Sequence, residues 1–143
     1  MSAPLPALLL LIAAPTQSLV ATPGSPAVLA PVVEAGARCS ANPQLTVALT
    51  GFTPARRGHA TIVVSLRTAD GRTAELGQVA VFPERAFTAA LPQARRFGFS
   101  VPRGALRLSP TVIVAVTGDG GPAAGARAIV GEARIGPAPQ ERC

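Results

Sequence analysis

Apolar side chains recur at every second position in a series of short stretches, and this period places the strongest constraint on the fold. Residues 44–50 (QLTVALT) put Leu45, Val47 and Leu49 on one face and threonine or alanine on the other. Such alternation is typical of a half-buried β-strand, whereas no stretch of the chain shows a sustained helical period. We therefore expect an all-β protein.

Six further stretches suggest strands, divided by glycine, proline and Asp-Gly turns. Asp70-Gly71 predicts a tight hairpin, because glycine readily takes a positive φ. Gly77 and Gly131, inside strands, predict bulges or close backbone neighbours. The segment 51–54 (GFTP) is expected to end the first strand, and residues 102–110 to form a connection with a short helical turn. The six further strands are expected at residues 60–67, 73–82, 86–91, 96–101, 111–117 and 126–135.

The clearest pair of strands lies at the end of the chain, where TVIVAVT and ARAIVGEARI flank the glycine-rich stretch GDGGPAAG. We predict a β-hairpin over residues 111–135. Its first strand alternates less, which fits a central strand that is covered on both sides. Seven short strands indicate two antiparallel sheets packed face to face, immunoglobulin-like in general architecture, with a small barrel as the alternative.

The N-terminal segment, residues 1–37, predicts export. No charged side chain occurs between Ser2 and Val33, and residues 8–14 form an apolar block too short to cross a bilayer core of ~30 Å as a helix. We predict a signal peptide over 1–21, a Pro/Ala-rich linker or edge-lying arm over 22–37, and a β-sandwich over 38–143, with order beginning near Arg38. The product would be periplasmic or extracellular, without a transmembrane helix. An uncleaved anchor or an apolar tail is the alternative.

The sequence has two cysteines, Cys39 and Cys143, at the two ends of the predicted sandwich. In an exported chain an even pair predicts a disulfide that would hold both termini. The alternatives are two free thiols, or a bond from Cys143 to another chain. A lipoprotein is not expected, since Arg38 directly precedes Cys39 where a small residue is required.

The sequence contains no motif that predicts a catalytic or metal centre. His59 is the single histidine, and it lies beside Arg56 and Arg57, where we expect it to cap a loop. A zinc or copper site needs several converging His or Cys ligands. The seven acidic residues are scattered, and no nucleophile motif is present. We expect no enzyme and no cofactor; an enzymatic hypothesis would depend on His59 and the scattered acids alone.

All thirteen basic side chains are arginine, and the formal net charge is +6. Arginine binds phosphate and carboxylate through a bidentate fork, so an acidic polymer or lipid headgroups would be suitable ligands. Nucleic acid is not expected, because phenylalanine alone supplies few stacking platforms. The arginines in or beside predicted loops, which could cluster at one end of the sandwich, are Arg56, Arg57, Arg95, Arg96, Arg103 and Arg107.

The order of strand motifs resembles one family. It is similar to the C-terminal β-sandwich domain of tyrosinase-like polyphenol oxidases, and the matching stretches are residues 77–82 (GQVAVF), 97–101 (FGFSV), 112–116 (VIVAV) and 129–135 (IVGEARI). The aspartate of the second motif is missing, with Gly98 or Ser100 nearby, and the histidine-rich dicopper domain has no counterpart. The resemblance implies a shielding or accessory sandwich without catalysis, acting on a separate subunit.

Together these features predict an exported, non-catalytic β-sandwich that binds or supports another protein. The alternative is an envelope module that attracts acidic polymers or lipid headgroups through its loop arginines; a hydrolase is the last choice.

Overall fold

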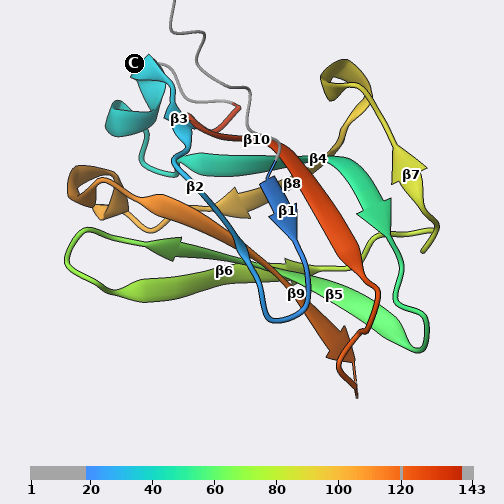
Figure 1. The fold of residues 1–143 in the computed structure, drawn as a ribbon. Coiled ribbons are helices and arrows are strands. Elements are labelled where there is room, and N and C mark those ends of the chain that lie inside the picture. The colour runs from blue at the N-terminus through green and yellow to red at the C-terminus, as the bar shows by residue number, and fades with distance from the viewer. Residues whose placement is uncertain (1–18, 120, 140–143) are drawn as a thin grey trace, which may run out of the picture.

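The computed structural model describes residues 19–119 and 121–139, and it confirms an all-β fold of two antiparallel sheets packed face to face (Figure 1). The six-stranded sheet contains β1 (Leu19–Ala21), β3 (Val32–Val33), β4 (Gln44–Thr53), β7 (Phe87–Thr88), β8 (Arg95–Ser100) and β10 (Arg127–Gly136). The four-stranded sheet contains β2 (Ala27–Leu29), β5 (His59–Arg67), β6 (Thr73–Val79) and β9 (Thr111–Asp119).

Three short 3-10 helices complete the described part of the chain: η1 (Ala35–Cys39), η2 (Leu91–Gln93) and η3 (Ala105–Leu108). The η3 turn confirms the helical turn expected between residues 102 and 110. Within the described ranges, no helix has the length and apolar character that crossing a membrane would require.

Strand order follows from a few long central strands. In the larger sheet β10 pairs with β4; β1 and β3 pair with different parts of β10, and β7 and β8 with different parts of β4. The smaller sheet runs β2-β9-β5-β6. All these pairings are antiparallel except that of β3 with β10. The arrangement leaves β1, β2 and β3 along one side of the sandwich and β6, β7 and β8 along the other.

The alternation read from the sequence fixes the inner faces. Leu45, Val47 and Leu49 of β4 are fully buried, as are the inward side chains of β5 and β9. Between the sheets, valine, leucine, isoleucine and alanine fill the core, as expected for sheets that pack about 10 Å apart. The largest fully buried side chains are Leu45, Leu49, Ile62, Leu66, Ile135, Val47, Val64, Val112, Val114 and Val130.

The predicted hairpin over residues 111–135 is wrong. Its two strands lie in different sheets: β9 pairs with β2 and β5, whereas β10 pairs with β1, β3 and β4. The glycine-rich connection is long enough to cross the gap between the layers, so its composition suits a crossover as well as a tight turn. β9 is central, but Ile113 and Ala115 on its outer face are only half-buried, so the described chain does not cover both of its faces.

Two glycine predictions are confirmed. The β5–β6 hairpin turns at Asp70-Gly71, where Gly71 has φ +86°. In β10 the register with β4 shifts between Val130 and Glu132, so Gly131 is a bulged residue, and a Cβ there would lie 2.5 Å from Thr50 Cγ2. The register of β6 likewise shifts next to Gly77.

Three strand boundaries differ from the prediction. The strand expected at residues 73–82 ends at Val79. The stretch 51–54 does not end β4 at Thr50, because Gly51 and Phe52 still pair with both β10 and β7. The expected strand 86–91 shortens to Phe87–Thr88, since the chain turns into η2 at Leu91. By contrast, Phe97, Phe99 and Val101 face the interior as predicted, and Phe99 and Val101 are buried.

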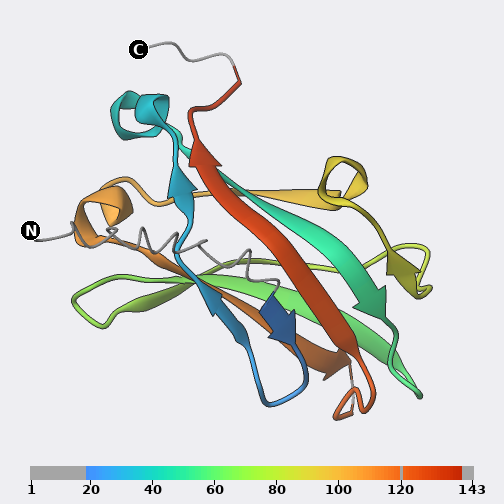
Figure 2. The same cartoon turned by 45° about the horizontal axis from the view of Figure 1, so that its top comes forward.

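The segment expected to be a linker is instead part of the sandwich. Leu19–Ala21 pairs with β10, Ala27–Leu29 with β9 and Val32–Val33 with β10, so the chain alternates between the two sheets along one edge (Figure 2). Order therefore begins well before Arg38, and the edge-lying arm is the correct description. Proline at this density still permits short edge strands, because an edge strand has one unpaired side. β1 itself falls in the predicted signal peptide, residues 1–21, so cleavage after Ala21 would remove this strand from the larger sheet. Residues 1–18 lie outside the described chain.

Candidate binding surface

The connection between β6 and β7, residues 80–86, presents an exposed aromatic side chain. Phe82 is 91% exposed, although the chain has only five phenylalanines and no tryptophan or tyrosine. Val81 directly before it is buried in the core. Sequence reasoning treated Phe82 as the end of a strand, but alternation already places it opposite the inward-facing Val81. The loop therefore holds an apolar ring in solvent.

Glu84 fixes the same loop to β5. Its Oε2 lies 2.6 Å from His59 Nδ1, and its Oε1 accepts a hydrogen bond from the backbone N–H of Ala60 at 3.1 Å. A further bond joins the Arg85 N–H to the Pro83 carbonyl at 2.8 Å. Phe82 is thus held between a buried residue on one side and a two-point carboxylate contact on the other. His59 fixes a loop, as expected, by binding Glu84.

The contact also changes the titration of both groups. The hydrogen bond and negative charge of Glu84, with a smaller contribution from Asp119, raise the pKa of His59 above its ordinary value of 6.5. The hydrogen bond from His59, followed by the one from the Ala60 N–H, lowers the pKa of Glu84 below its ordinary value of 4.5. Both side chains are at the surface, so the contact acts on the loop and adds little to global stability.

We expect the His59–Glu84 contact to be strongest between about pH 4.5 and 6.5. The contribution of His59 is complete below its unfolded pKa and is lost as pH rises through its raised folded pKa. That of Glu84 is complete above its unfolded pKa and is lost as pH falls through its lowered folded pKa. An NMR titration of the single imidazole should show its pKa fall in Glu84→Gln, and fall much less in Asp119→Asn. An unchanged pKa in Glu84→Gln would contradict the contact.

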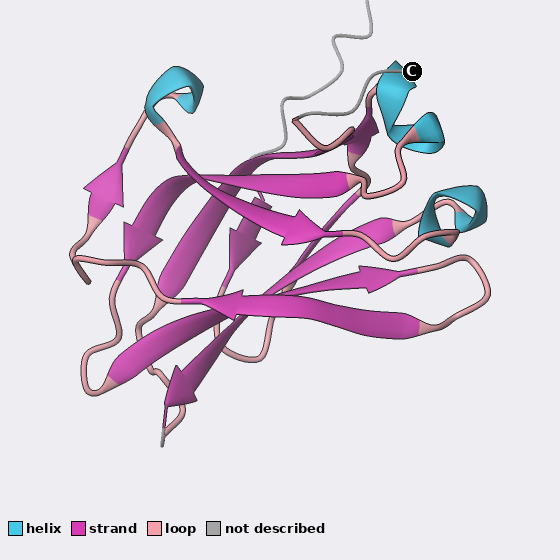
Figure 3. Cartoon of the chain, turned by 180° about the vertical axis from the view of Figure 1, so that it is seen from behind, coloured by secondary structure: helices cyan, strands magenta, loops and turns pink. Residues whose placement is uncertain are grey.

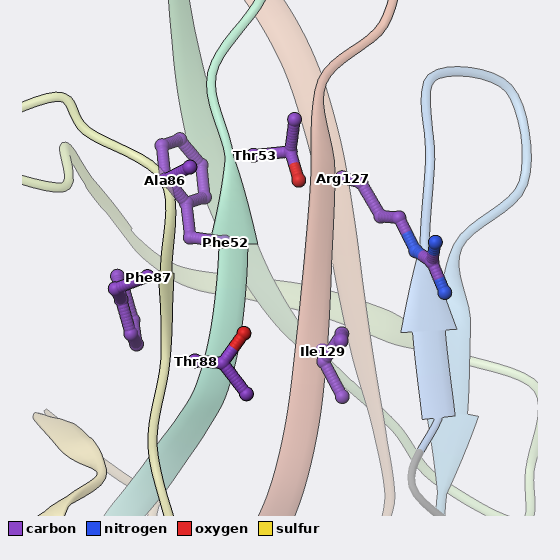
Figure 4. A pocket seen from close by; sticks show the side chains of 7 residues that line it. All are labelled: Phe52, Thr53, Ala86, Phe87, Thr88, Arg127 and Ile129. Carbon is purple, nitrogen blue, oxygen red and sulfur yellow. The ribbon is translucent and has the colours of Figure 1, made fainter.

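A shallow pocket of about 360 Å³ opens beside this loop (Figure 4). Phe87 and Arg127 lie at opposite sides of it, with Thr53 and Thr88 between them. The Phe52 and Phe87 rings stack with centroids 6.5 Å apart and an interplanar angle of 28°. Aromatic surface next to a guanidinium and hydroxyl groups suits an amphipathic side chain of a partner. Its lining residues are Phe52, Thr53, Ala86, Phe87, Thr88, Arg127 and Ile129.

Arg95 and Arg96 begin β8 and have different surroundings. Arg95 pairs with Leu49 and so points to the inner face, where its guanidinium carbon lies 4.2 Å from the Phe87 ring centroid. Its Nη1 is buried without a hydrogen-bond partner among residues 19–119 and 121–139. Arg96 points outward and donates hydrogen bonds to the carbonyls of Leu91 at 2.9 Å and Ala94 at 3.3 Å. Arg96 therefore stabilises the η2 turn.

The six candidate arginines do not gather at one end of the sandwich. Arg56 and Arg57 follow the end of β4. β8 runs antiparallel to β4, with Ser100 opposite Gln44, so the segment that carries Arg103 and Arg107 lies where β4 begins. Arg56, Arg57 and Arg103 lie in connections, as expected, whereas Arg107 lies in η3 and Arg95 and Arg96 lie in β8. The expectation of a common cluster is wrong, because the directions of β4 and β8 place these side chains at different ends.

At that second end, a hollow of about 460 Å³ lies between the β5–β6 turn and η3. Arg72 and Arg103 both line it. Asp70 contacts Thr68 Oγ1, accepts the Arg72 N–H at 3.2 Å and lies 3.7 Å from Arg72 Nε, and these hydrogen bonds lower its pKa. Asp70 thus shapes the turn and offsets part of the positive charge.

The expected disulfide involves Cys143, which lies outside the described residues, so the pairing stays a prediction. Cys39 ends η1, with Sγ 3.3 Å from the Gly36 carbonyl oxygen. The chain beyond β10 returns to this point: the Ala138 N–H donates to Ser40 Oγ at 3.3 Å, and Pro137 lies against Gly36. Because Ala138 contacts the residue next to Cys39, the last residues can reach that cysteine.

The described residues contain no cluster of metal-binding side chains that would support the enzymatic hypothesis. Within the described chain, no set of three or more His, Cys, Asp or Glu side chains could hold a metal ion. Glu132 accepts a hydrogen bond from Arg134 at 2.8 Å, and Glu34 lies 3.5 Å from the same guanidinium; these contacts raise the pKa of Arg134. These two carboxylates thus form surface ion pairs.

The fold and surface define a class: a two-sheet β-sandwich with a filled core, a braced loop carrying an exposed phenylalanine, and a shallow aromatic pocket beside it. No protein-family model, curated protein or solved structure matches the chain.

Proposed function

We propose that this chain is an exported, non-catalytic β-sandwich that binds another protein through the loop 80–86, which carries Phe82, and through the pocket that Ala86 lines at the end of this loop. The observation that carries the proposal is the 91% exposure of Phe82 on a loop held by Val81 and Glu84. Burying a phenylalanine contributes roughly 1.5–3 kcal/mol, and a loop whose backbone is already held in place loses little conformational entropy on binding. Aromatic anchors of this kind dominate many protein interfaces.

The family resemblance makes a tyrosinase-like oxidase the first partner class to test. Such a partner would supply the dicopper chemistry, and this chain would supply a surface that covers or supports it. The proposal assigns no reaction to the chain itself. It agrees with a sandwich interior filled by apolar side chains.

Photo-cross-linking in the source cells tests the proposal. Benzoylphenylalanine placed at Phe82 should cross-link to one discrete protein, whereas the same group at Leu108, exposed at the other end, should not. With that partner purified, Phe82→Ala should weaken binding about 30-fold or more, as expected for an interface anchor, and Leu108→Ala should change it less than twofold. Equal cross-linking at both positions would contradict the proposal.

The second candidate is an envelope module that binds acidic polymers or lipid headgroups. The hollow lined by Arg72 and Arg103 favours it, since two guanidinium groups border one space. Binding to anionic vesicles should weaken steeply as salt rises from low to physiological concentration, and Arg103→Gln should weaken it further. Binding that is independent of salt would rule this candidate out.

A further inference from the structure

The edge strand β8 has an unpaired side. Within the described chain it pairs only with β4, and the register from Arg95 to Ser100 is continuous, without a bulge. Seen from behind the view of Figure 1, the strand on the other side of β8 is β6 of the opposite sheet, and no hydrogen-bonded ladder joins the two described strands (Figure 3). A regular edge of this kind can accept a further strand.

The pattern of hydrogen bonds between β8 and β4 shows which backbone groups of β8 point to its open side. The Val101 N–H donates to the Pro43 carbonyl at 2.9 Å, and Ser100 is paired with Gln44. In an antiparallel pair the bonded positions alternate, so the backbone groups of the inward residues point to β4. The backbone groups of Arg96, Gly98 and Ser100 therefore point away from β4. A Cβ at Gly98 would meet no atom within 4 Å, so the outer face of β8 is also open at this position.

The other edges lack these properties. Pro23, Pro26 and Pro31 flank the short strands β1, β2 and β3, and proline blocks strand addition. β6 is interrupted by the register shift beside Leu76, and bulges likewise disfavour edge pairing. Among the described strands, β8 thus offers the longest regular unpaired edge.

The inner side of β8 indicates what an added strand would carry. Phe97 and Phe99 face the interior, and Phe99 contacts Gly77 of the opposite sheet. Next to them, Arg95 Nη1 is buried without a partner among the described residues. A strand lying beside β8 would place its own inward side chains opposite these three positions. A carboxylate opposite Arg95 would supply the missing acceptor, and apolar side chains would extend the row of phenylalanines.

We propose that β8 binds an extended segment of a partner protein by strand addition, with an aspartate or glutamate opposite Arg95 and apolar residues opposite Phe97 and Phe99. The inference deepens the proposed function, because it names the kind of segment that the partner offers; it can fail while the Phe82 interface stands. An inward charge on an edge strand disfavours purely apolar partners. Arg95 would therefore give this edge its selectivity.

The test uses the folded chain and two labelled peptides, Thr-Val-Thr-Val-Thr-Asp-Thr and Thr-Asp-Thr-Val-Thr-Val-Thr, because the added strand can run in either direction. At least one should bind in fluorescence anisotropy, and replacing its aspartate by lysine should weaken binding at least about tenfold. Gly98→Pro removes an N–H on the open side and leaves the β4 bonds in place. It should also weaken binding at least about tenfold, with an unchanged circular dichroism spectrum.

Arg95→Gln should remove the preference for aspartate over lysine, whereas Arg134→Gln, at an exposed position of β10, should preserve it. No binding of either peptide would overturn the proposal, as would equal binding of the aspartate and lysine forms. A folded Gly98→Pro variant that binds normally would also overturn it. So would a concentration-dependent dimer that Gly98→Pro abolishes, since β8 would then pair with a second copy. None of these outcomes would alter cross-linking at Phe82, so the two proposals fail separately.

Discussion

Leu45→Ala is expected to lower the free energy of unfolding by about 2–5 kcal/mol, because it empties a fully buried site. Leu45 lies directly opposite Ile135 of β10, and both are buried in the core. This loss is a large fraction of the stability of an ordinary domain, which is about 5–15 kcal/mol. Chemical denaturation followed by circular dichroism measures it.

Leu45 also tests whether β10 lies beside β4 in the larger sheet. In a double-mutant cycle, Leu45→Ala and Ile135→Val should couple by about 0.5 kcal/mol or more, because the two side chains are cross-strand neighbours. The matched control is Ile62→Val, which is paired with Val116 and Val79 in the other sheet. Leu45→Ala and Ile62→Val should be additive within about 0.5 kcal/mol. The reverse result would contradict the pairing of β4 with β10.

Cys39→Ser is expected to lower the free energy of unfolding by about 2–4 kcal/mol under oxidising conditions. The predicted bond to Cys143 would close a loop of about 100 residues, for which the chain-entropy model allows up to about 4.7 kcal/mol. Cys143→Ser should have the same effect. Intact-mass analysis without reductant should find the wild type two hydrogens lighter than its reduced form.

Reduction supplies the internal control for the cysteine prediction. With reductant present, the wild type and Cys39→Ser should unfold at nearly the same denaturant concentration. A wild type that retains two free thiols after oxidative expression would rule out the intramolecular bond. A covalent dimer lost in Cys143→Ser would instead support pairing between chains.

The sequence predicts the local part of the fold well. Inner faces are read from a two-residue period, which depends only on neighbours in the chain, and Leu45, Val47 and Leu49 are buried accordingly. The turn at Asp70-Gly71 and the bulge at Gly131 are equally local. Pairing is not local: nothing in the stretch 118–125 distinguishes a hairpin from a crossover. Likewise, proline suggested a linker over 22–37, although short edge strands tolerate it.

For the candidate surface too, the local features could be predicted from the sequence, whereas contacts between distant residues could not. The outward position of Phe82 follows from its place beside Val81, so alternation could have found it. The contact of Glu84 with His59 joins residues that are far apart in the sequence, and it requires the strand order. The separation of Arg57 from Arg103 likewise depends on β8 running opposite to β4.

The place of β10 in the larger sheet has a consequence for biosynthesis. Among the described strands β10 is the last to leave the ribosome, yet it is the direct neighbour of both β1 and β4, in the first part of the described chain. β4 can pair with β7 and β8 before then, but β1 and β3 have no partner in that sheet until β10 is present. Contacts between distant parts of a sequence also slow folding. The larger sheet of the nascent polypeptide is therefore expected to stay incomplete until β10 has been synthesised.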